Sequence, residues 1–325
     1  MSVRWGILST ARVNRKFLAG VSRSDLIEVL AVASRNPGRA REYAAEQGIE
    51  RAYGTYDELL ADPEIEAVYI SLPNSLHLEW TTRALRAGKH VLCEKPLSRR
   101  AADVDATFDL AEREGRLLME AFMYRHHPQI VRAVELVDSG AIGTLRLIRG
   151  AFSFAIDGET DVRLAAELDG GALMDVGCYC VNAARRLAGE PEVVTGQQVV
   201  SADGIDLAFA ATMRFAAGVL AHFDAGLLLA GRDELEIVGE QASLFLDDPW
   251  HALAPVIEIR RGDEIQRIEF EPANSYQLEA DNFSLAIRGS AEPLLGRRDA
   301  IGQARTIEAL YEAADGGRAV PVSGG

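Results

Sequence analysis

The chain has 325 residues, of which 48% are hydrophobic and 26% charged, and this length favours two domains that each bury a core. The composition is typical of a soluble globular protein, and no apolar run reaches the ~20 residues that span a bilayer, so we do not expect a membrane protein. The formal net charge of −15, without a concentrated basic patch, excludes a nucleic-acid partner.

The N-terminal third alternates short β-branched runs with helical stretches, a pattern typical of parallel strands joined by crossover helices. The first strand follows no basic and apolar signal region, so we expect a cytoplasmic protein. The expected strands are Val3 to Leu8, Ile27 to Ser34, Ala67 to Ser71, His90 to Cys93 and Leu117 to Ala121, with a short one near Ala52. The expected helices, each followed by a terminating glycine, are Arg39 to Gln47, His77 to Ala87 and Ala101 to Glu114. Residues 1–121 are therefore predicted to form a doubly wound, dinucleotide-binding Rossmann domain of the α/β class.

After Ala121 the pattern changes, and residues 122–325 predict an α+β domain that binds the substrate. Its strands follow one another with short turns, which predicts a large, mostly antiparallel open sheet. The expected strands are Thr144 to Phe154, Glu192 to Ser201, Leu207 to Phe215, Val219 to Phe223, Glu234 to Val238, Val256 to Arg261 and Ile265 to Phe270. The expected helices are one that ends near Gly140, one around Asp175 to Leu187, and then Tyr276 to Arg288 and Arg297 to Ala314.

The three cysteines, Cys93, Cys178 and Cys180, are too few for a disulfide framework. The two that lie two residues apart also lack the spacing and the histidine partners of a zinc site. We therefore expect reduced, structural thiols and no metal.

The first predicted strand runs into a turn of small residues that leads into a helix. Backbone N–H groups and the helix dipole at such a turn can hold a pyrophosphate, which makes Gly6, Ser9, Thr10 and Ala11 candidate cofactor residues. The complete glycine fingerprint would need glycines near Ser9 and Ala11, so an ordinary strand-to-helix turn remains an alternative.

Ser34 and Arg35 follow the second strand, where an acidic residue would bond the ribose 2′-hydroxyl of NAD. A hydroxyl beside a guanidinium suits a 2′-phosphate instead, because arginine offers a charged, forked set of donors. The pair predicts NADP as the cofactor, with NAD possible and with a merely solvated Arg35 as the alternative.

Two further strands end in residues that can approach a bound nicotinamide. Leu72-Pro73-Asn74 and His77 follow one strand, and Lys95 follows the next. Ligands of open α/β sheets bind at the carboxyl ends of the strands. Lys95 is the stronger candidate, because its stem should pack between an apolar strand and Pro96 and direct its ammonium locally.

Gly170 and Gly171 precede a predicted helix that carries Asp175, Tyr179 and Asn182. Their spacing of four and three residues places them on one helix face, so a carboxylate and a phenol can point together into a cleft. A capping or partly buried polar pair is the alternative.

Five segments occur in the order seen in one family: Gly6 to Val13, Leu72-Pro73-Asn74 with His77, Gly88 to Pro96, Tyr124-Arg125 with Pro128, and Gly170 to Tyr179. On these segments the chain resembles the Gfo/Idh/MocA-family oxidoreductases over nearly its whole length. The resemblance implies that Lys95 is the catalytic lysine, that its bond to Pro96 is cis, and that Asp175 and Tyr179 face the substrate. It also implies that Glu94 and Arg125 join the cofactor-binding residues and that the open sheet forms a homodimer or homotetramer.

The chain departs from the pattern of this family at two places. Ser9 and Ala11 stand where many members have glycine, which implies a more crowded phosphate turn. Tyr179 stands where inositol dehydrogenases usually have histidine. The chain is therefore more similar to the branch that holds glucose-fructose oxidoreductase, NADP-dependent xylose dehydrogenases and dimeric dihydrodiol dehydrogenases.

These residues predict an NADP-dependent oxidoreductase that transfers a hydride between nicotinamide and a CH–OH or C=O carbon of a sugar or sugar-like cyclic alcohol. The types considered are aldose 1-dehydrogenase, dihydrodiol dehydrogenase and ketosugar reductase. Tyr179 is expected to carry the hydroxyl proton, because the ammonium of Lys95 lowers the phenol pKa from its ordinary ~10. Asp175 would orient the substrate hydroxyl or the lysine. The tentative substrate contacts are Arg163, Asn182 and Tyr276, with domain packing as the alternative for Arg163 and Tyr276.

Two other functions stay open. One is a non-catalytic NADP-binding sensor, since a fold alone does not give a function. Lys95, Asp175 and Tyr179 argue against it, because a sensor needs none of them. The other is a redox-assisted glycosidase with retained nicotinamide, which release of reduced cofactor would distinguish.

Overall fold

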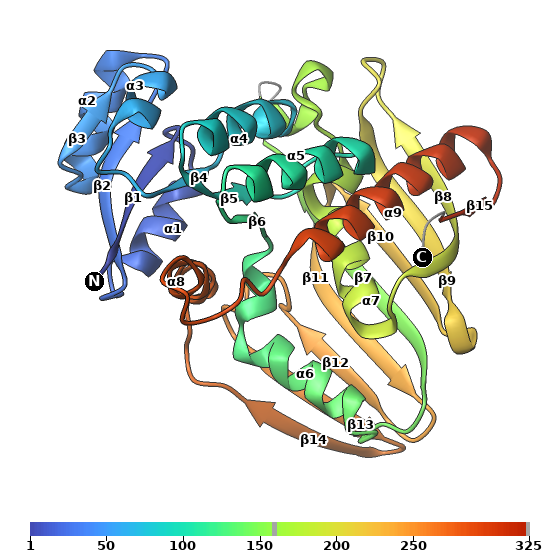
Figure 1. Cartoon of the computed structure of the whole chain (residues 1–325). Coiled ribbons are helices and arrows are strands. Elements are labelled where there is room, and N and C mark those ends of the chain that lie inside the picture. Colours follow the sequence, from blue (N-terminus) through green and yellow to red (C-terminus); the bar gives the residue numbers. More distant parts are fainter. Residues whose placement is uncertain (158–160, 323–325) are drawn as a thin grey trace. The chain divides into compact units, whose positions relative to one another are not determined.

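The first sheet contains six strands, β1 (Val3–Leu8), β2 (Ile27–Ala33), β3 (Arg51–Tyr53), β4 (Ala67–Ile70), β5 (His90–Glu94) and β6 (Leu118–Ala121). In this computed structural model, which describes residues 1–157 and 161–322, the strands are all parallel and lie in the order β3-β2-β1-β4-β5-β6 (Figure 1). This is the strand order of a doubly wound dinucleotide-binding domain, and the predicted α/β class is confirmed.

Helices connect these strands as crossovers. They are α1 (Asn14–Val21), α2 (Pro37–Gln47), α3 (Tyr56–Ala61), α4 (His77–Arg86) and α5 (Ala101–Arg113). The start of α2 is fixed by the side chain of Asn36, which accepts hydrogen bonds from two backbone N–H groups of the first turn. The short α3 was not predicted, although Thr55 and Glu58 form a capping box that the sequence displays.

A late part of the chain returns to this sheet. The structure divides into unit 1, which is Met1–Ser98, Ala102–Met123 and Asn274–Ile301, and unit 2, which is Arg99–Ala101, Tyr124–Ala273 and Gly302–Gly325. Helix α8 (Ser275–Ile287) therefore lies in unit 1, whereas the sequence analysis placed all of residues 122–325 in one domain. Packing is the reason, because α8 lies against α1 and the indole N–H of Trp5 donates to the Ser284 hydroxyl at 3.3 Å.

Unit 2 is built on a nine-stranded sheet. Its strands are β7 (Leu145–Ala155), β8 (Pro191–Val200), β9 (Asp206–Phe215), β10 (Leu220–Gly226), β11 (Leu228–Gly239), β12 (Ser243–Asp247), β13 (Val256–Arg261), β14 (Glu264–Glu269) and β15 (Val320–Pro321). The order is β14-β13-β12-β11-β7-β10-β9-β8-β15, and every pair is antiparallel except β10 with β7. The predicted large, mostly antiparallel sheet is confirmed, although β12 and β15 were missed and β11 begins six residues before the predicted Glu234.

One face of this sheet carries helices. Helix α7 (Cys178–Ala188) packs on β7 and β10, and α6 (Pro128–Asp138) packs on β13 (Figure 1). The long α9 (Arg297–Gly316) begins in unit 1 and ends in unit 2, where Tyr311 contacts Phe209 of β9 edge-on at 5.8 Å. Side chains on the other sheet face alternate with the buried ones and are exposed along β9 and β10.

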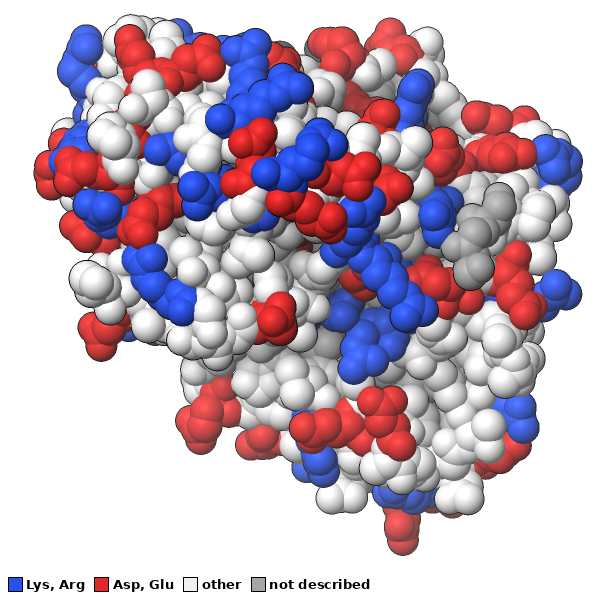
Figure 2. Space-filling model, viewed as in Figure 1, with Lys and Arg blue, Asp and Glu red and all other residues white. Residues whose placement is uncertain are grey.

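The surface carries charges of both signs (Figure 2), and the cysteine side chains are buried. Figure 2 shows acidic and basic side chains interspersed over the viewed face, and the whole chain has 49 acidic against 34 basic residues. Within the ranges described above, no helix has the length and hydropathy needed to cross a membrane. The three cysteines are buried and form no disulfide with each other, as expected of structural thiols.

Candidate active site

The turn after β1 is held by a network of small polar side chains. Ser9 has a φ of 125°, a conformation that favours glycine. Its hydroxyl lies 2.8 Å from the Ser71 hydroxyl, the Ser71 hydroxyl donates to the Asn14 amide oxygen at 2.6 Å, and the Asn14 side-chain N–H donates to the Ser9 carbonyl at 2.9 Å. The network therefore holds Ser9 in this conformation, and its third member, the fully buried Asn14, was not predicted.

The backbone of this turn is already partly hydrogen-bonded. Helix α1 has no side-chain cap, but its first N–H groups, those of Asn14, Arg15 and Lys16, donate to the preceding carbonyls of Ala11, Arg12 and Val13, and the Ala11 N–H donates to the Ser9 hydroxyl at 3.1 Å. Thr10 and Ala11 are partly exposed in the turn that precedes the helix. Gly6 lies earlier, inside β1, where a Cβ atom would come within 2.7 Å of Leu59. Gly6 is thus required for packing against α3, which is a different role from the predicted contact with the cofactor.

At the carboxyl end of β2, Ser34 is buried and Arg35 is exposed. The Arg35 side chain hydrogen-bonds the phenol of Tyr56, and Arg39 of α2 acts on the same phenol electrostatically. Burial is the larger influence and raises the pKa of Tyr56. The end of β2 thus carries two guanidinium groups, of which the sequence analysis identified only Arg35.

His77 joins the two loops that follow β4 and β5. Its Nδ1 lies 2.8 Å from the Pro96 carbonyl oxygen and its Nε2 lies 2.8 Å from the Leu72 carbonyl oxygen. The side chain is buried, with only 1% of its surface exposed. Since both ring nitrogens face backbone carbonyls, His77 holds the two loops together and is poorly placed to exchange a proton with a substrate. Asn74 begins the short 3-10 turn Asn74–Leu76 in front of it.

Glu94 and Lys95 stand at the end of β5, and both are half-buried. The phenol of Tyr69 donates a hydrogen bond to the Glu94 carboxylate. The peptide bond between Lys95 and Pro96 is cis, as the resemblance implied. Lys95 is thus held at the sheet edge where parallel α/β sheets bind their ligands.

Tyr276 belongs to the same neighbourhood. It lies near the start of α8 in unit 1, within electrostatic range of Glu94 and Glu279. Burial raises the pKa of its phenol well above the ordinary value, and the pKa of the fully buried Glu279 is raised for the same reason. These groups make the region around Glu94 a desolvated one.

In unit 2 the segment with Asp175 forms a single π-helical turn, Leu173–Gly177, directly before α7. Gly171 precedes it with a φ of 120°, and a Cβ atom there would lie 2.0 Å from Asp206. The Asp206 carboxylate accepts the Leu173 N–H at 2.7 Å and the Tyr311 hydroxyl at 3.1 Å. Asp206 thus holds the start of the π turn. Since π turns frequently occur at functional sites, this turn supports a functional role for the segment that carries Asp175.

Asp175 lies on this turn and is bound by Arg163. The guanidinium Nε lies 3.1 Å from the Asp175 carboxylate, and Arg163 also bonds Asp161 at 3.4 Å. The same guanidinium lies over the ring of Phe154, 5.3 Å from its centre. The predicted substrate neighbour Arg163 is therefore the direct partner of the predicted catalytic carboxylate.

Tyr179 is surrounded by aromatic rings. Its ring centre lies 5.6 Å from that of Tyr124, 5.3 Å from that of Phe152 and 5.9 Å from that of Trp250. The indole N–H of Trp250 donates to the Ala151 carbonyl at 3.1 Å, which fixes the plane of that ring. Phe152 and Trp250 were not singled out from the sequence, because they come from different strands and loops and share no motif.

Asn182 and Arg125 form a buried pair in unit 2. The Asn182 amide oxygen accepts the Tyr124 hydroxyl at 2.7 Å and the Arg125 guanidinium at 2.9 Å. Asn182 has no exposed surface, so the tentative assignment of a substrate contact to it is not supported. Asn182 holds the hydroxyl of Tyr124, whose ring contacts that of Tyr179. Arg125 was expected to bind the cofactor, but only 8% of it is exposed and its guanidinium donates to the Asn182 amide oxygen.

Comparisons with known proteins agree with both units. Residues 3–122 match the Gfo/Idh/MocA oxidoreductase family with its NAD-binding Rossmann fold, and residues 130–245 match the Gfo/Idh/MocA C-terminal domain. The chain is 37% identical to D-xylose 1-dehydrogenase (NADP(+)) 2 of Haloferax volcanii, over 97% of this chain and 98% of that protein.

Two solved structures show the same architecture. A 3-ketoreductase from Actinomadura kijaniata in complex with NADP and TDP-benzene has a TM-score of 0.91 and 31% identity, covering 96% of this chain and 98% of its own. The aldose-aldose oxidoreductase from Caulobacter crescentus has a TM-score of 0.92 and 28% identity, covering 99% of this chain and 100% of its own. With the family models and the xylose dehydrogenase, they establish that the chain belongs to the Gfo/Idh/MocA family of oxidoreductases.

Proposed function

We propose that the protein is an NADP-dependent oxidoreductase that moves a hydride between nicotinamide and a CH–OH or C=O carbon of a sugar or a sugar-like cyclic alcohol. The observation that carries the proposal is the arrangement at the start of α7 in unit 2, where Asp175 of the preceding π turn is bound by Arg163 and Tyr179 of α7 is set among aromatic rings. Aromatic faces and charged hydrogen-bonding groups are what a small polyol needs for binding and orientation. The xylose dehydrogenase and the 3-ketoreductase among its relatives support this substrate class.

The residues of unit 1 fit a nicotinamide dinucleotide phosphate. The turn that leads from β1 into α1 is the proposed pyrophosphate site, and Arg35 stands where a ribose 2′-phosphate needs a cation. No carboxylate follows β2 within Ser34 to Arg39, so nothing there repels the phosphate. NADP supplies the acceptor or donor of the hydride. The relatives named with NADP support the same choice.

The polar residues have separate proposed roles in proton transfer and substrate orientation. In the oxidative direction the substrate hydroxyl loses a proton, and the Tyr179 phenol is the proposed carrier of that proton. Asp175 accepts a hydrogen bond from the substrate, and Arg163 fixes the carboxylate in the orientation that permits it. Lys95 is the proposed catalytic cation, at the sheet edge of unit 1 where the nicotinamide is expected.

A panel of aldoses, ketosugars and cyclic diols, followed by the absorbance of NADPH, tests the proposal. We expect turnover of at least one class of substrate. Lys95→Met should abolish turnover and leave the Kd for NADPH within a few-fold, because the pyrophosphate contacts lie elsewhere. Tyr179→Phe should lower kcat by about 10²–10⁴-fold, the usual size of a general acid/base contribution, because the ring still packs.

Thermal unfolding and NADPH titration serve as the controls for both variants. The catalytic roles would be refuted by a Lys95→Met enzyme with activity close to that of the wild type, or by an unchanged kcat in Tyr179→Phe. A wild type that binds NADPH and turns over no member of the panel would refute the substrate class.

A further inference from the structure

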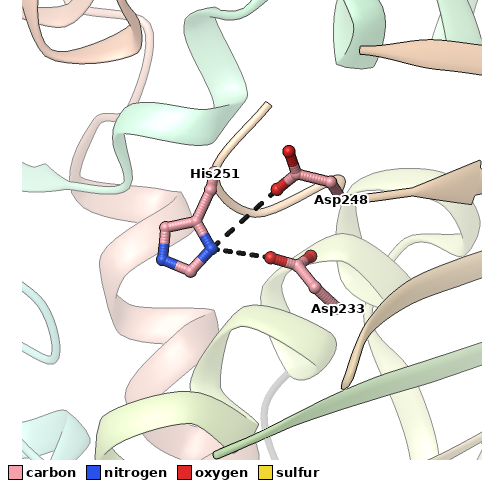
Figure 3. Close-up of side chains that lie close together, drawn as sticks. All are labelled: Asp233, Asp248 and His251. Atoms are coloured by element: carbon pink, nitrogen blue, oxygen red, sulfur yellow. Dashed lines mark hydrogen bonds and ion pairs between the residues drawn. The ribbon is translucent and has the colours of Figure 1, made fainter. Parts of the chain in front are cut away.

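A histidine lies beside the aromatic cluster of unit 2 that contains Phe152 and Tyr179, at a position that the proposed reaction does not use. His251 belongs to the loop after β12, and its Nδ1 lies 2.7 Å from the Asp233 carboxylate of β11 and 3.9 Å from that of Asp248 (Figure 3). The side chain of His251 is 34% exposed. The second ring nitrogen, Nε2, points away from both carboxylates.

The loop that carries His251 is fixed by hydrogen bonds. The Asp233 carboxylate accepts the Trp250 N–H at 3.1 Å, and the Asp233 carbonyl accepts the Asp248 N–H at 2.7 Å. The Asp248 carboxylate accepts the Leu253 N–H at 2.5 Å and the Ala254 N–H at 3.2 Å. His251 is therefore presented on a preorganised loop.

The contact with Asp233 decides what the imidazole can offer. A carboxylate only accepts hydrogen bonds, so Nδ1 carries the proton in the neutral ring and Nε2 is left as an acceptor. Asp233 is itself desolvated, since burial raises its pKa, and its hydrogen bond to His251 opposes this effect. The exposed edge of His251 thus presents a lone pair of fixed direction.

The partly exposed ring of His251 packs against the buried aromatic cluster around Tyr179, in which Phe152 is 6% and Tyr179 7% exposed. It meets Phe152 edge-on, with 5.5 Å between the ring centres and an angle of 88°. Phe152 in turn meets Tyr179 at 5.3 Å and 74°. One aromatic ring therefore separates the imidazole from the proposed proton carrier, a spacing suited to a substrate of several carbon atoms.

We propose that His251 is a specificity-determining residue that accepts a hydrogen bond from a substrate hydroxyl through Nε2, with Asp233 as its positioning residue. The inference rests on the proposed function and narrows it. The substrate carries a second hydroxyl, away from the reacting carbon, that donates to this imidazole. A site built to bond a hydroxyl discriminates strongly against the analogue that lacks it, because the polar group is then left unpaired.

A divalent cation is the rival occupant. Asp233, Asp248 and His251 offer three ligand atoms that lie within 4.8 Å of one another. A cation would need the lone pair of Nδ1, which in the structure faces Asp233. It would also compete with the backbone N–H groups bonded to both carboxylates. The observed bonds therefore favour the hydroxyl.

The test compares a substrate aldose with its monodeoxy analogues in four proteins: the wild type, His251→Phe, Asp233→Asn and Asp248→Asn. The wild type should lose about 10- to 100-fold in kcat/KM when one particular hydroxyl is removed. His251→Phe keeps an aromatic ring against Phe152 and should turn over the parent sugar as slowly as the wild type turns over that deoxy analogue, with no further loss on the analogue itself.

Asp233→Asn should show the same selective loss, because the amide oxygen stays on the Trp250 N–H, the amide N–H₂ then faces Nδ1 as a donor, and Nε2 takes the proton. Asp248→Asn, the matched acid-to-amide control, keeps one oxygen that can accept both loop N–H groups, so it should leave the discrimination within about threefold. Thermal unfolding identifies a misfolded variant, and His251→Leu, which also lacks an acceptor, then replaces His251→Phe. Unchanged discrimination in His251→Phe and His251→Leu would overturn the inference while leaving the proposed function intact.

Two further outcomes separate the alternatives. Loss of activity on treatment with a chelator, restored by Zn²⁺ or Mn²⁺ in the wild type and weakened equally by all three substitutions, would establish the cation and overturn the hydroxyl contact. A wild type that neither binds any sugar in a calorimetric titration nor turns one over would refute the proposed function, and this inference with it.

Discussion

Arg35 places an exposed positive charge at the end of β2, and the choice of cofactor depends on it. A charge-assisted contact with the 2′-phosphate contributes about 1.5–3 kcal/mol, so we expect kcat/KM to favour NADP over NAD by roughly ten- to a hundred-fold. Arg35→Asp should abolish or reverse this preference, because a carboxylate repels the phosphate and can bond a free 2′-hydroxyl. The measurement is kcat/KM with both cofactors at one salt concentration, since ionic strength screens an exposed contact.

Arg39 provides the matched control. It lies four residues further along the chain, in the first turn of α2, and also acts on Tyr56. Arg39→Asp should weaken the preference less than Arg35→Asp if the residue that directly follows Ser34 makes the main contact. Equal use of both cofactors by the wild type, or a persistent NADP preference in Arg35→Asp, would make Arg35 an ordinary surface residue.

Residue types and order indicated much of the candidate site, but not the contacts of its side chains. Lys95 beside Pro96 and Asp175 after two glycines could be singled out, because their motifs are local. Asn182 was placed beside Asp175 by the 3.6-residue period, yet it is wholly buried against Arg125 and Tyr124. A side chain on the expected helix can still point into the core, and the sequence does not reveal its depth.

His251 is the opposite case, a residue that the sequence analysis did not single out but that the structure places one ring away from Tyr179. Its partner Asp233 lies on β11, and the loop between Asp248 and Leu253 includes residues with positive φ, at 70° for Asp248 and 52° for Ala252. Because hydrogen bonds between residues far apart in the sequence bring His251 and Asp233 together, no motif or spacing predicts this pair.

At the scale of elements, the turn that carries Asp175 depends on a buried carboxylate. Desolvation raises the pKa of Asp206 to about 6 from its ordinary 3.8, although the Leu173 N–H and the Tyr311 hydroxyl oppose the rise. The unfolded chain therefore loses this proton at lower pH than the folded protein does. Stability falls as the pH rises from about 4 to about 6, and the full cost, about 3 kcal/mol, applies above that window.

Asp206→Asn should remove this dependence. The amide retains an acceptor for the Leu173 N–H and carries no charge, so the unfolding free energy of the variant minus that of the wild type should rise by up to about 3 kcal/mol between pH 4 and pH 7. Urea denaturation at several pH values measures it. The exposed Asp203, changed to Asn, is the matched control and should give a flat difference. A flat difference for Asp206→Asn as well would show that its carboxyl is not perturbed by burial.

The elements also show where pattern reasoning fails. Strand β11 runs twelve residues from Leu228, but its first half is exposed and interrupted by a register shift, so only Glu234 to Val238 displayed a strand pattern. Strand β12 has only five residues and directly follows a tight turn, so its strand pattern was not recognised. The doubly wound sheet was easier to predict, because its strands are short, buried and apolar.

At the scale of the whole molecule, the nine-stranded sheet has a face whose side chains are exposed. On this face Leu220 of β10 lies opposite Arg214 of β9, and Thr212 lies opposite both His222 and Thr195. Leu220 is 51% exposed. The resemblance to the family implied association through this sheet, and its exposed face includes the apolar Leu220, so we predict a homodimer or homotetramer formed through it.

Thr212→Arg combined with Leu220→Arg tests this prediction. The guanidinium at position 220 lies opposite Arg214 of β9, the one at position 212 lies two residues from Arg214 on the same strand, and a symmetric interface would bury these like charges against one another. We expect the mass of the wild type, measured by light scattering at micromolar concentration, to be that of a dimer or tetramer, and that of the variant to be that of a monomer with an unchanged circular dichroism spectrum. Val131→Asp, on the exposed side of α6, is the control and should retain the wild-type mass. A monomeric wild type would contradict the prediction outright, and a variant that keeps the wild-type mass would move the interface to another surface.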